Sequence, residues 1–147
     1  MINWITKRDE YWSGTFLSSY FRNSDNNPEM EICIDNACVA DYAEKCVFSF
    51  NHLTASDISK ICKGILDCSG RQNTRWKLNS FLWRRNPVAI LDHCYFSSVY
   101  VNIPDDKNQI SYIVEGEGEW EDVIGFVIHD GHLVYVGTDY LNEHNWS

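Results

Sequence analysis

An Asp-Gly pair between two apolar runs constrains the fold of this chain more than any other feature. Asp130 and Gly131 separate Val123–Ile128 from Leu133–Val136. A two-residue type I′ turn requires positive φ at both central positions, which Asp tolerates and Gly adopts freely. The sequence therefore predicts a β-hairpin over residues 123–136.

The position of this turn also gives an expected register. Counting back from it yields three facing pairs: Ile128 with Leu133, Val127 with Val134, and Phe126 with Tyr135. Side chains alternate between the two faces of a strand, so Tyr135 should share a face with Phe126. Because both faces are then apolar, we expect central strands that are covered on both sides.

The clearest helical pattern covers residues 54–69. Thr54 is a good N-cap, and Asp57 supports the first turn. Apolar residues recur at helical spacing and form one stripe: Ile58, Ile61, Cys62, Ile65 and Leu66. Gly70 is a natural C-terminal stop. A second helix over residues 73–85, the only basic stretch, is left open.

The remaining regular segments indicate strands. They are Tyr11–Phe21, Met30–Ile34, Cys46–Phe50, Val88–Leu91, Tyr95–Ile103 and Ile110–Val114. Together with the hairpin and the helix they predict an α+β fold, in which an antiparallel β-sheet carries one main amphipathic helix. A chain of 147 residues is long enough to bury one core, so residues 1–147 are expected to form a single domain.

An acidic run precedes the hairpin. Glu115, Glu117, Glu119 and Glu121 alternate with other residues, so in a strand all four would project from one face. Trp120 lies among them, and Asp122 follows. Two interpretations stay open: a solvated edge or loop, or a site for a cationic partner with Trp120 as its apolar anchor.

Charge is distributed unevenly along the chain. Residues 1–86 hold ten acids and eleven Lys or Arg, whereas residues 87–147 hold eleven acids and Lys107 alone, a net charge of −10. Asp105 and Asp106, in a predicted turn, belong to this acidic half. Such a field disfavours nucleic-acid phosphate as a ligand and favours a basic protein.

Residues that could carry chemistry are scattered. The six cysteines form no CxxC pair, and they are expected to be reduced and buried. His129 and His132 flank the turn without further ligands, so no metal or other cofactor is expected. Cys94 with a remote histidine, or paired glutamates, leaves a small hydrolase open. No catalytic motif supports it, so we do not expect an enzyme.

The N-terminal sequence and hydropathy bear on the compartment. MINWITKRDEYW has neither the apolar region nor the cleavage site of a signal peptide. The longest apolar stretches are too short to span a bilayer. A cytosolic protein without a membrane partner is expected.

Several of these features occur together between about residues 102 and 140. They are Glu119-Trp120-Glu121, Gly125, the strand Phe126–Ile128, Asp130-Gly131 and Val136-Gly137. In this order they resemble the closing hairpin of small bacterial immunity proteins of contact-dependent inhibition and related polymorphic toxin systems. Where the usual form has a His before the glycine, this chain has Ile124.

The resemblance implies a compact cytosolic protein that binds a toxin domain, commonly a basic nuclease, and blocks it. The charge distribution favours a basic partner independently. We therefore expect a stoichiometric inhibitor, with a regulatory or chaperone-like interaction module as the alternative. The expected toxin-binding residues are Asp105, Asp106, Glu115, Glu117, Glu119, Trp120, Glu121 and Asp122.

Overall fold

A single seven-stranded sheet organises the molecule. The computed structural model describes residues 1–8, 11–35, 39–72, 86–101, 108–119 and 122–141. The strands lie side by side in chain order: β1 (Asn3–Arg8), β2 (Tyr11–Leu17), β3 (Glu29–Ile34), β4 (Cys94–Val101), β5 (Tyr112–Gly118), β6 (Asp122–His129) and β7 (His132–Gly137).

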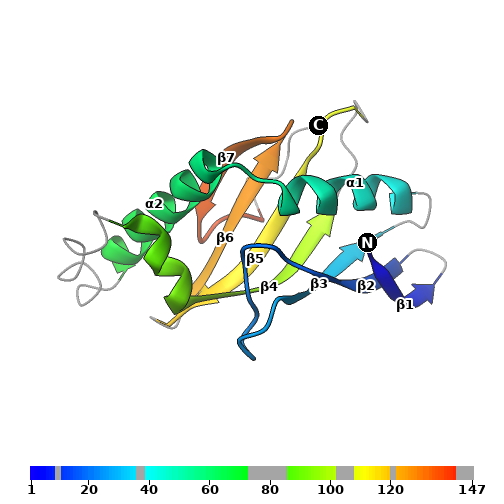
Figure 1. Ribbon diagram of the computed structural model, residues 1–147, viewed down its shortest axis with the longest axis horizontal. Coiled ribbons are helices and arrows are strands. Elements are labelled where there is room, and N and C mark those ends of the chain that lie inside the picture. The colour runs from blue at the N-terminus through cyan, green and yellow to red at the C-terminus, as the bar shows by residue number, and fades with distance from the viewer. Residues whose placement is uncertain (9–10, 36–38, 73–85, 102–107, 120–121, 142–147) are drawn as a thin grey trace.

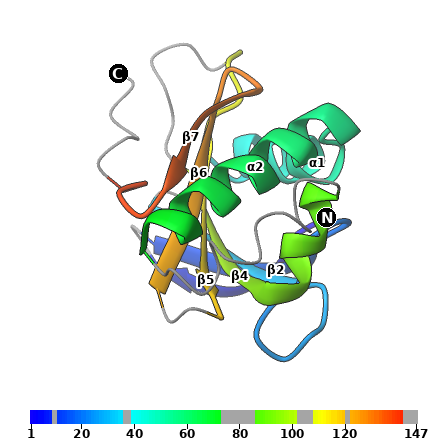
Figure 2. The same ribbon diagram turned by 90° about the vertical axis from the view of Figure 1, so that its left-hand side faces the viewer.

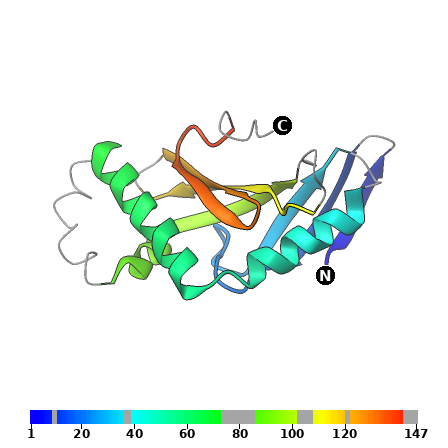
Figure 3. The same ribbon diagram turned by 90° about the horizontal axis from the view of Figure 1, so that it is seen from above.

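Two helices cover one face of this sheet (Figures 1 and 2). α1 (Ala40–Asn51), α2 (Ala55–Gln72) and the short 3₁₀ helix η2 (Pro87–His93) all lie between β3 and β4 in the chain. Seen from above, α1 and α2 follow one another along the same side of the strands (Figure 3). The predicted α+β class is confirmed. The predicted second helix over 73–85 lies outside the described residues.

The helical crossover explains the one parallel pairing in the sheet. It returns the chain to the end of the sheet where β3 began, so β4 pairs with β3 in parallel, with Glu31 opposite Ser98. The other five neighbouring pairs are antiparallel. The predicted antiparallel sheet is therefore confirmed except at this pair, which is parallel.

The main core lies between the helices and the sheet. Its centre is aromatic: the ring centroids of Phe21 and Phe50 are 5.1 Å apart, and those of Phe21 and Phe96 are 5.0 Å apart. Phe126 from β6 lies 5.7 Å from Phe96. Helix α2 adds five buried side chains among its described ones: Ile58, Ile61, Cys62, Ile65 and Cys68.

The start of α2 follows the predicted cap. The Asp57 amide donates to Thr54 Oγ1 at 3.1 Å, and the Thr54 amide donates to the Asp57 carboxylate at the same distance. This reciprocal capping satisfies two amides that have no partner inside the helix. The helix does not stop at Gly70 but continues to Gln72.

Residues Cys46–Phe50, predicted as a strand, belong to α1. The buried residues of α1 show why the short run was misleading. They are Tyr42, Ala43, Cys46, Val47 and Phe50, which follow a helical period that begins before the run. Val88–Leu91, also predicted as extended, lies in η2. Pro87 begins η2, where its fixed φ suits a helical turn.

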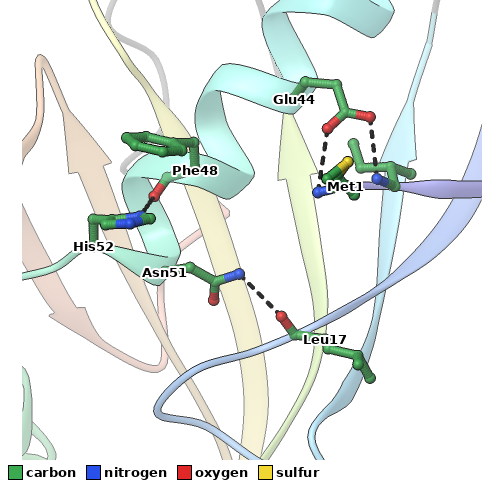
Figure 4. A network of polar contacts seen from close by, with 7 residues as sticks. Met1, Leu17, Glu44, Phe48, Asn51 and His52 are labelled. Carbon is green, nitrogen blue, oxygen red and sulfur yellow. Dashed lines mark hydrogen bonds and ion pairs between the residues drawn. The ribbon is translucent and has the colours of Figure 1, made fainter.

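Polar contacts from α1 hold the N-terminal strands (Figure 4). Glu44 accepts the Ile2 amide at 3.1 Å and lies 3.5 Å from the N-terminal ammonium of Met1. About two turns further on, Asn51 Nδ2 donates to the Leu17 carbonyl at 2.9 Å, where β2 ends. These contacts attach β1 and β2 to the helical layer.

The predicted hairpin is present, with a bulge that the sequence did not reveal. Asp130 and Gly131 have φ values of 53° and 75°, as a type I′ turn requires. Ile128 faces Leu133 as predicted, but the register then shifts, and Val127 faces Tyr135. The extra residue, Val134, is 55% exposed.

The bulge corrects two of the predicted pairs and one strand position. Phe126 faces Val136 rather than Tyr135, and Val127 does not face Val134. Tyr135 consequently packs with Val127 on the sheet face away from the helices. β6 is buried on both faces, but β7 ends the sheet and is not a central strand.

A pair of substitutions on α2 tests the helix–sheet core. Ile65 is fully buried, so Ile65→Asp would place an unpaired charge in the core and lower the free energy of unfolding by more than about 3 kcal/mol. Lys63→Asp, on the exposed side of the same helix, should cost less than about 1 kcal/mol. Urea denaturation followed by circular dichroism measures both. Equal losses would contradict this packing.

Candidate functional site

The sheet face away from α1 and α2, here called the distal face, carries the polar side chains of the central strands. Alternation sends Tyr112, Val114 and Gly116 of β5 toward the helices, and Glu115 and Glu117 the other way. The register then places Ser98 beside Glu115 and Tyr95 beside Glu117. The predicted alternation of the acidic run therefore holds through β5.

Glu115 is held by two phenols on the distal face. The Tyr140 hydroxyl donates to Glu115 Oε2 at 2.8 Å, and the Tyr100 hydroxyl donates to Oε1 at 3.3 Å. Burial, followed by the hydrogen bond to Glu115, raises the pKa of Tyr140. Its phenol therefore stays protonated and keeps donating to the carboxylate.

Gly125 allows Tyr140 to reach this position. A Cβ at residue 125 would lie 2.5 Å from the Tyr140 ring and 2.7 Å from the Val114 carbonyl oxygen. The ring can lie on the strand only because no side chain is present there. Tyr140 is 3% exposed and packs with Ile113 and Val127 in a small second core.

Glu119 makes different contacts because β5 ends at Gly118. Its Oε2 lies 2.7 Å from His93 Nδ1, and its Oε1 accepts the Tyr95 hydroxyl at 3.2 Å. Its amide also donates to the His93 carbonyl at 2.9 Å. The hydrogen bond from His93 is the main reason that the pKa of Glu119 is lowered.

A cavity of about 230 Å³ opens on the distal face beside these carboxylates. Its lining includes Tyr95, Ser97, Glu115, Glu117 and Tyr140. Ser97 is the extra residue of a bulge in β4, where the pairing with β5 shifts between Phe96 and Ser98. The Glu117 side chain is exposed, and its carboxylate has no hydrogen-bond or ion-pair partner in the described part of the chain.

Two further acids on this face were missed by the sequence analysis. Glu29 and Glu31 alternate with buried Met30 and Ile32 in β3, so both carboxylates project from the distal face. Glu31 lies opposite Ser98, which in turn lies opposite Glu115. The signal was present, because the alternation of Met30–Ile34 already assigned the glutamates to the opposite face.

The structure places only some of the predicted site residues. Glu115, Glu117 and Glu119 lie together on adjoining parts of β5 and its end. The backbone of Asp122 begins β6 opposite Gly118. Asp105, Asp106, Trp120 and Glu121 lie outside the described residues, so their roles stay predictions.

The cysteines and histidines considered above for catalysis or metal binding lie in different environments. Cys94 is 1% exposed within the main core, and burial raises its pKa, so it is a poor source of thiolate near neutral pH. Cys46, Cys62 and Cys68 are buried, as predicted, whereas Cys33 is half-buried. His129 Nδ1 lies 2.9 Å from the buried Ser111 hydroxyl. No three His, Cys, Asp or Glu residues of the described segments are grouped to hold a metal ion.

The sequence of this chain matches one protein family over nearly its whole length. The family described as a domain of unknown function (DUF6985) matches residues 2–142, and the chain belongs to it. No curated protein and no solved structure matches. Among the described residues, no helix combines the length and the apolar character needed to cross a membrane.

A double-mutant cycle tests the contact between Tyr140 and Glu115. Tyr140→Phe removes one donor from a half-buried carboxylate and should lower the free energy of unfolding by about 1 kcal/mol. The same substitution in a Glu115→Gln background should cost less, because the charge-assisted bond is already lost. Urea denaturation gives the coupling energy. Additive effects would contradict the contact.

The contact between His93 and Glu119 can be tested by measuring the pKa of the Glu119 carboxylate. The pKa of Glu119 in the folded state is lower than the ordinary glutamate value of 4.5. The contact therefore stabilises the folded protein at pH values above 4.5, and this stabilisation is lost as the pH falls through the lowered pKa. Carboxyl ¹³C NMR should show the pKa rising toward 4.5 in His93→Ala. His52→Ala, at the residue that follows α1, is the control and should leave the pKa of Glu119 unchanged.

Proposed function

We propose that this protein is a stoichiometric inhibitor of the immunity type, which binds a basic toxin domain through its distal face. A nuclease is the expected class of toxin, and the cytoplasm is the expected compartment. The observation that carries the proposal is the gathering of five carboxylates on the distal face and at the end of β5: Glu29, Glu31, Glu115, Glu117 and Glu119.

The positions of the basic side chains support this orientation. Lys45 lies on α1, Lys60 and Lys63 lie on α2, and Lys7 lies over the Trp12 ring. Arg22 lies 6.0 Å from the Tyr95 ring and pairs with Asp92 at 3.7 Å. A negative face of this kind attracts a basic partner over a distance and orients it during encounter.

Tyrosines supply the contact area that charge alone does not give. Tyr95 and Tyr100 are half-buried on the distal face, and their rings combine apolar surface with a hydroxyl. Such side chains are common at interface centres, because they bury large areas and lose little conformational entropy. Acidic groups around them would take the place of nucleic-acid phosphates on the toxin surface.

A regulatory or chaperone-like module is the second candidate. The distal face offers charge and tyrosines to any basic protein, so the same geometry serves a partner that is not toxic. The reading frame next to this gene separates the two candidates, because a toxin–immunity pair requires a neighbouring frame with a toxic C-terminal part.

The proposal predicts co-purification and a specific charge effect. Co-expressed with the C-terminal fragment of the reading frame just upstream, this chain should co-purify at equal stoichiometry and suppress the lethality of the fragment. Glu117→Lys should then slow association roughly threefold or more at low salt. Stopped-flow fluorescence or surface plasmon resonance measures the rate.

Asp67→Lys provides the matched control for this charge effect. It makes the same change of charge on the exposed side of α2, away from the distal face, and should slow association less. A harmless fragment, or a chain that stays in the flow-through, would contradict the immunity function. Equal effects of the two substitutions would contradict the use of the distal face.

A further inference from the structure

We infer that the cavity on the distal face receives one arginine side chain of the basic partner. This inference rests on the proposed function and adds the chemistry by which the partner is anchored. The cavity measures about 230 Å³, below the roughly 300–1,000 Å³ of pockets for drug-sized ligands. Its size therefore suits one side chain rather than a whole small-molecule ligand.

The charges at the cavity select a cation. Glu115 and Glu117 both line it. The Glu115 carboxylate already accepts two phenol hydroxyls, whereas Glu117 has no partner among the described residues. A cation that enters the cavity would thus meet the Glu115 carboxylate, which is already fixed in position, and the Glu117 carboxylate, which would gain its first strong hydrogen bonds. Because Glu115 is already ordered in the folded protein, binding loses no further conformational entropy at that side chain.

The walls favour arginine over lysine. Tyr95 and Tyr140 both line the cavity, and the other lining residues besides the two glutamates are Ser24, Ser97, Gly116 and Val123. A planar guanidinium stacks on aromatic rings and donates two parallel hydrogen bonds to one carboxylate, whereas an ammonium is a compact and strongly hydrated charge. The combination of rings with a free carboxylate matches the guanidinium.

The bulge in β4 is what opens this space. At Ser97 two residues of β4 stand where β5 supplies one, so the strand bends locally between Tyr95 and Ser98. Tyr140, whose ring packs against the backbone of Gly125, also lines the cavity. The cavity is therefore formed by the bulge at Ser97 and by the close approach of the Tyr140 ring to Gly125.

A titration with small probes tests the inference without the partner. N-acetyl-arginine amide, added to the ¹⁵N-labelled protein, should shift the amide signals of Gly116 and Val123, both of which line the cavity, with a Kd in the roughly millimolar range expected of an isolated side chain. N-acetyl-citrulline amide, which has the same shape without the charge, should shift neither signal. N-acetyl-lysine amide should bind at least about threefold more weakly.

Variants locate the site. Glu117→Gln and Tyr95→Leu should each weaken arginine binding at least about fivefold, because they remove the free carboxylate and one ring. Glu29→Gln removes an exposed carboxylate of the same face that does not line the cavity, and it should leave binding unchanged. A dispersed amide spectrum of each variant shows that it has folded.

The outcomes separate this inference from the proposed function. Absent shifts, equal responses to citrulline or lysine, or equal effects of Glu29→Gln and Glu117→Gln would overturn the arginine site. If the upstream fragment still co-purified in that case, the immunity function would stand without the site. Arginine binding at the cavity with no co-purification would support the site and contradict the immunity function.

Discussion

Burial of one sheet face beneath α1 and α2 is the constraint on which the rest of the molecule depends. The aromatic group formed by Phe21, Phe50, Phe96 and Phe126 joins α1 to β4, β6 and the segment that follows β2. Burial of side chains of this size is the largest favourable contribution to folding. Because that face provides the stability, the central strands can present carboxylates and hydroxyls on the distal face.

Three glutamates of one run have three different physical situations, although the sequence presents them as equivalent. Glu115 is held by Tyr100 and Tyr140, Glu119 is held by His93 and Tyr95, and Glu117 is exposed. The difference comes from where β5 ends and from which neighbours β4 and the segment after β7 supply. We propose that the two hydrogen-bonded carboxylates shape the face, and that Glu117, whose carboxylate has no partner among the described residues, contacts the binding partner.

Local signals were enough to predict part of this fold. The Thr54 cap and the Asp-Gly turn act over a few residues, and both were recognised in the sequence. The bulge at Val134 changes the register without altering composition, so the facing pairs beyond Leu133 were wrong. The parallel pairing of β3 with β4 joins residues 67 positions apart in the chain, such as Glu31 and Ser98, and the cavity is lined by five separate segments. No pattern in a short window contains that information.

Carboxyl footprinting of the free and partner-bound protein tests the central claim most directly. A carbodiimide and an amine label exposed carboxylates, and mass spectrometry counts the label at each residue. If the distal face is the binding surface, labelling of Glu31 and Glu117 falls in the complex, while Asp41 on α1 and Asp67 on α2, which are also exposed, label as before. Protection of Asp41 and Asp67 with unchanged labelling of Glu31 and Glu117 would show that the partner binds the helical side, and would contradict the account.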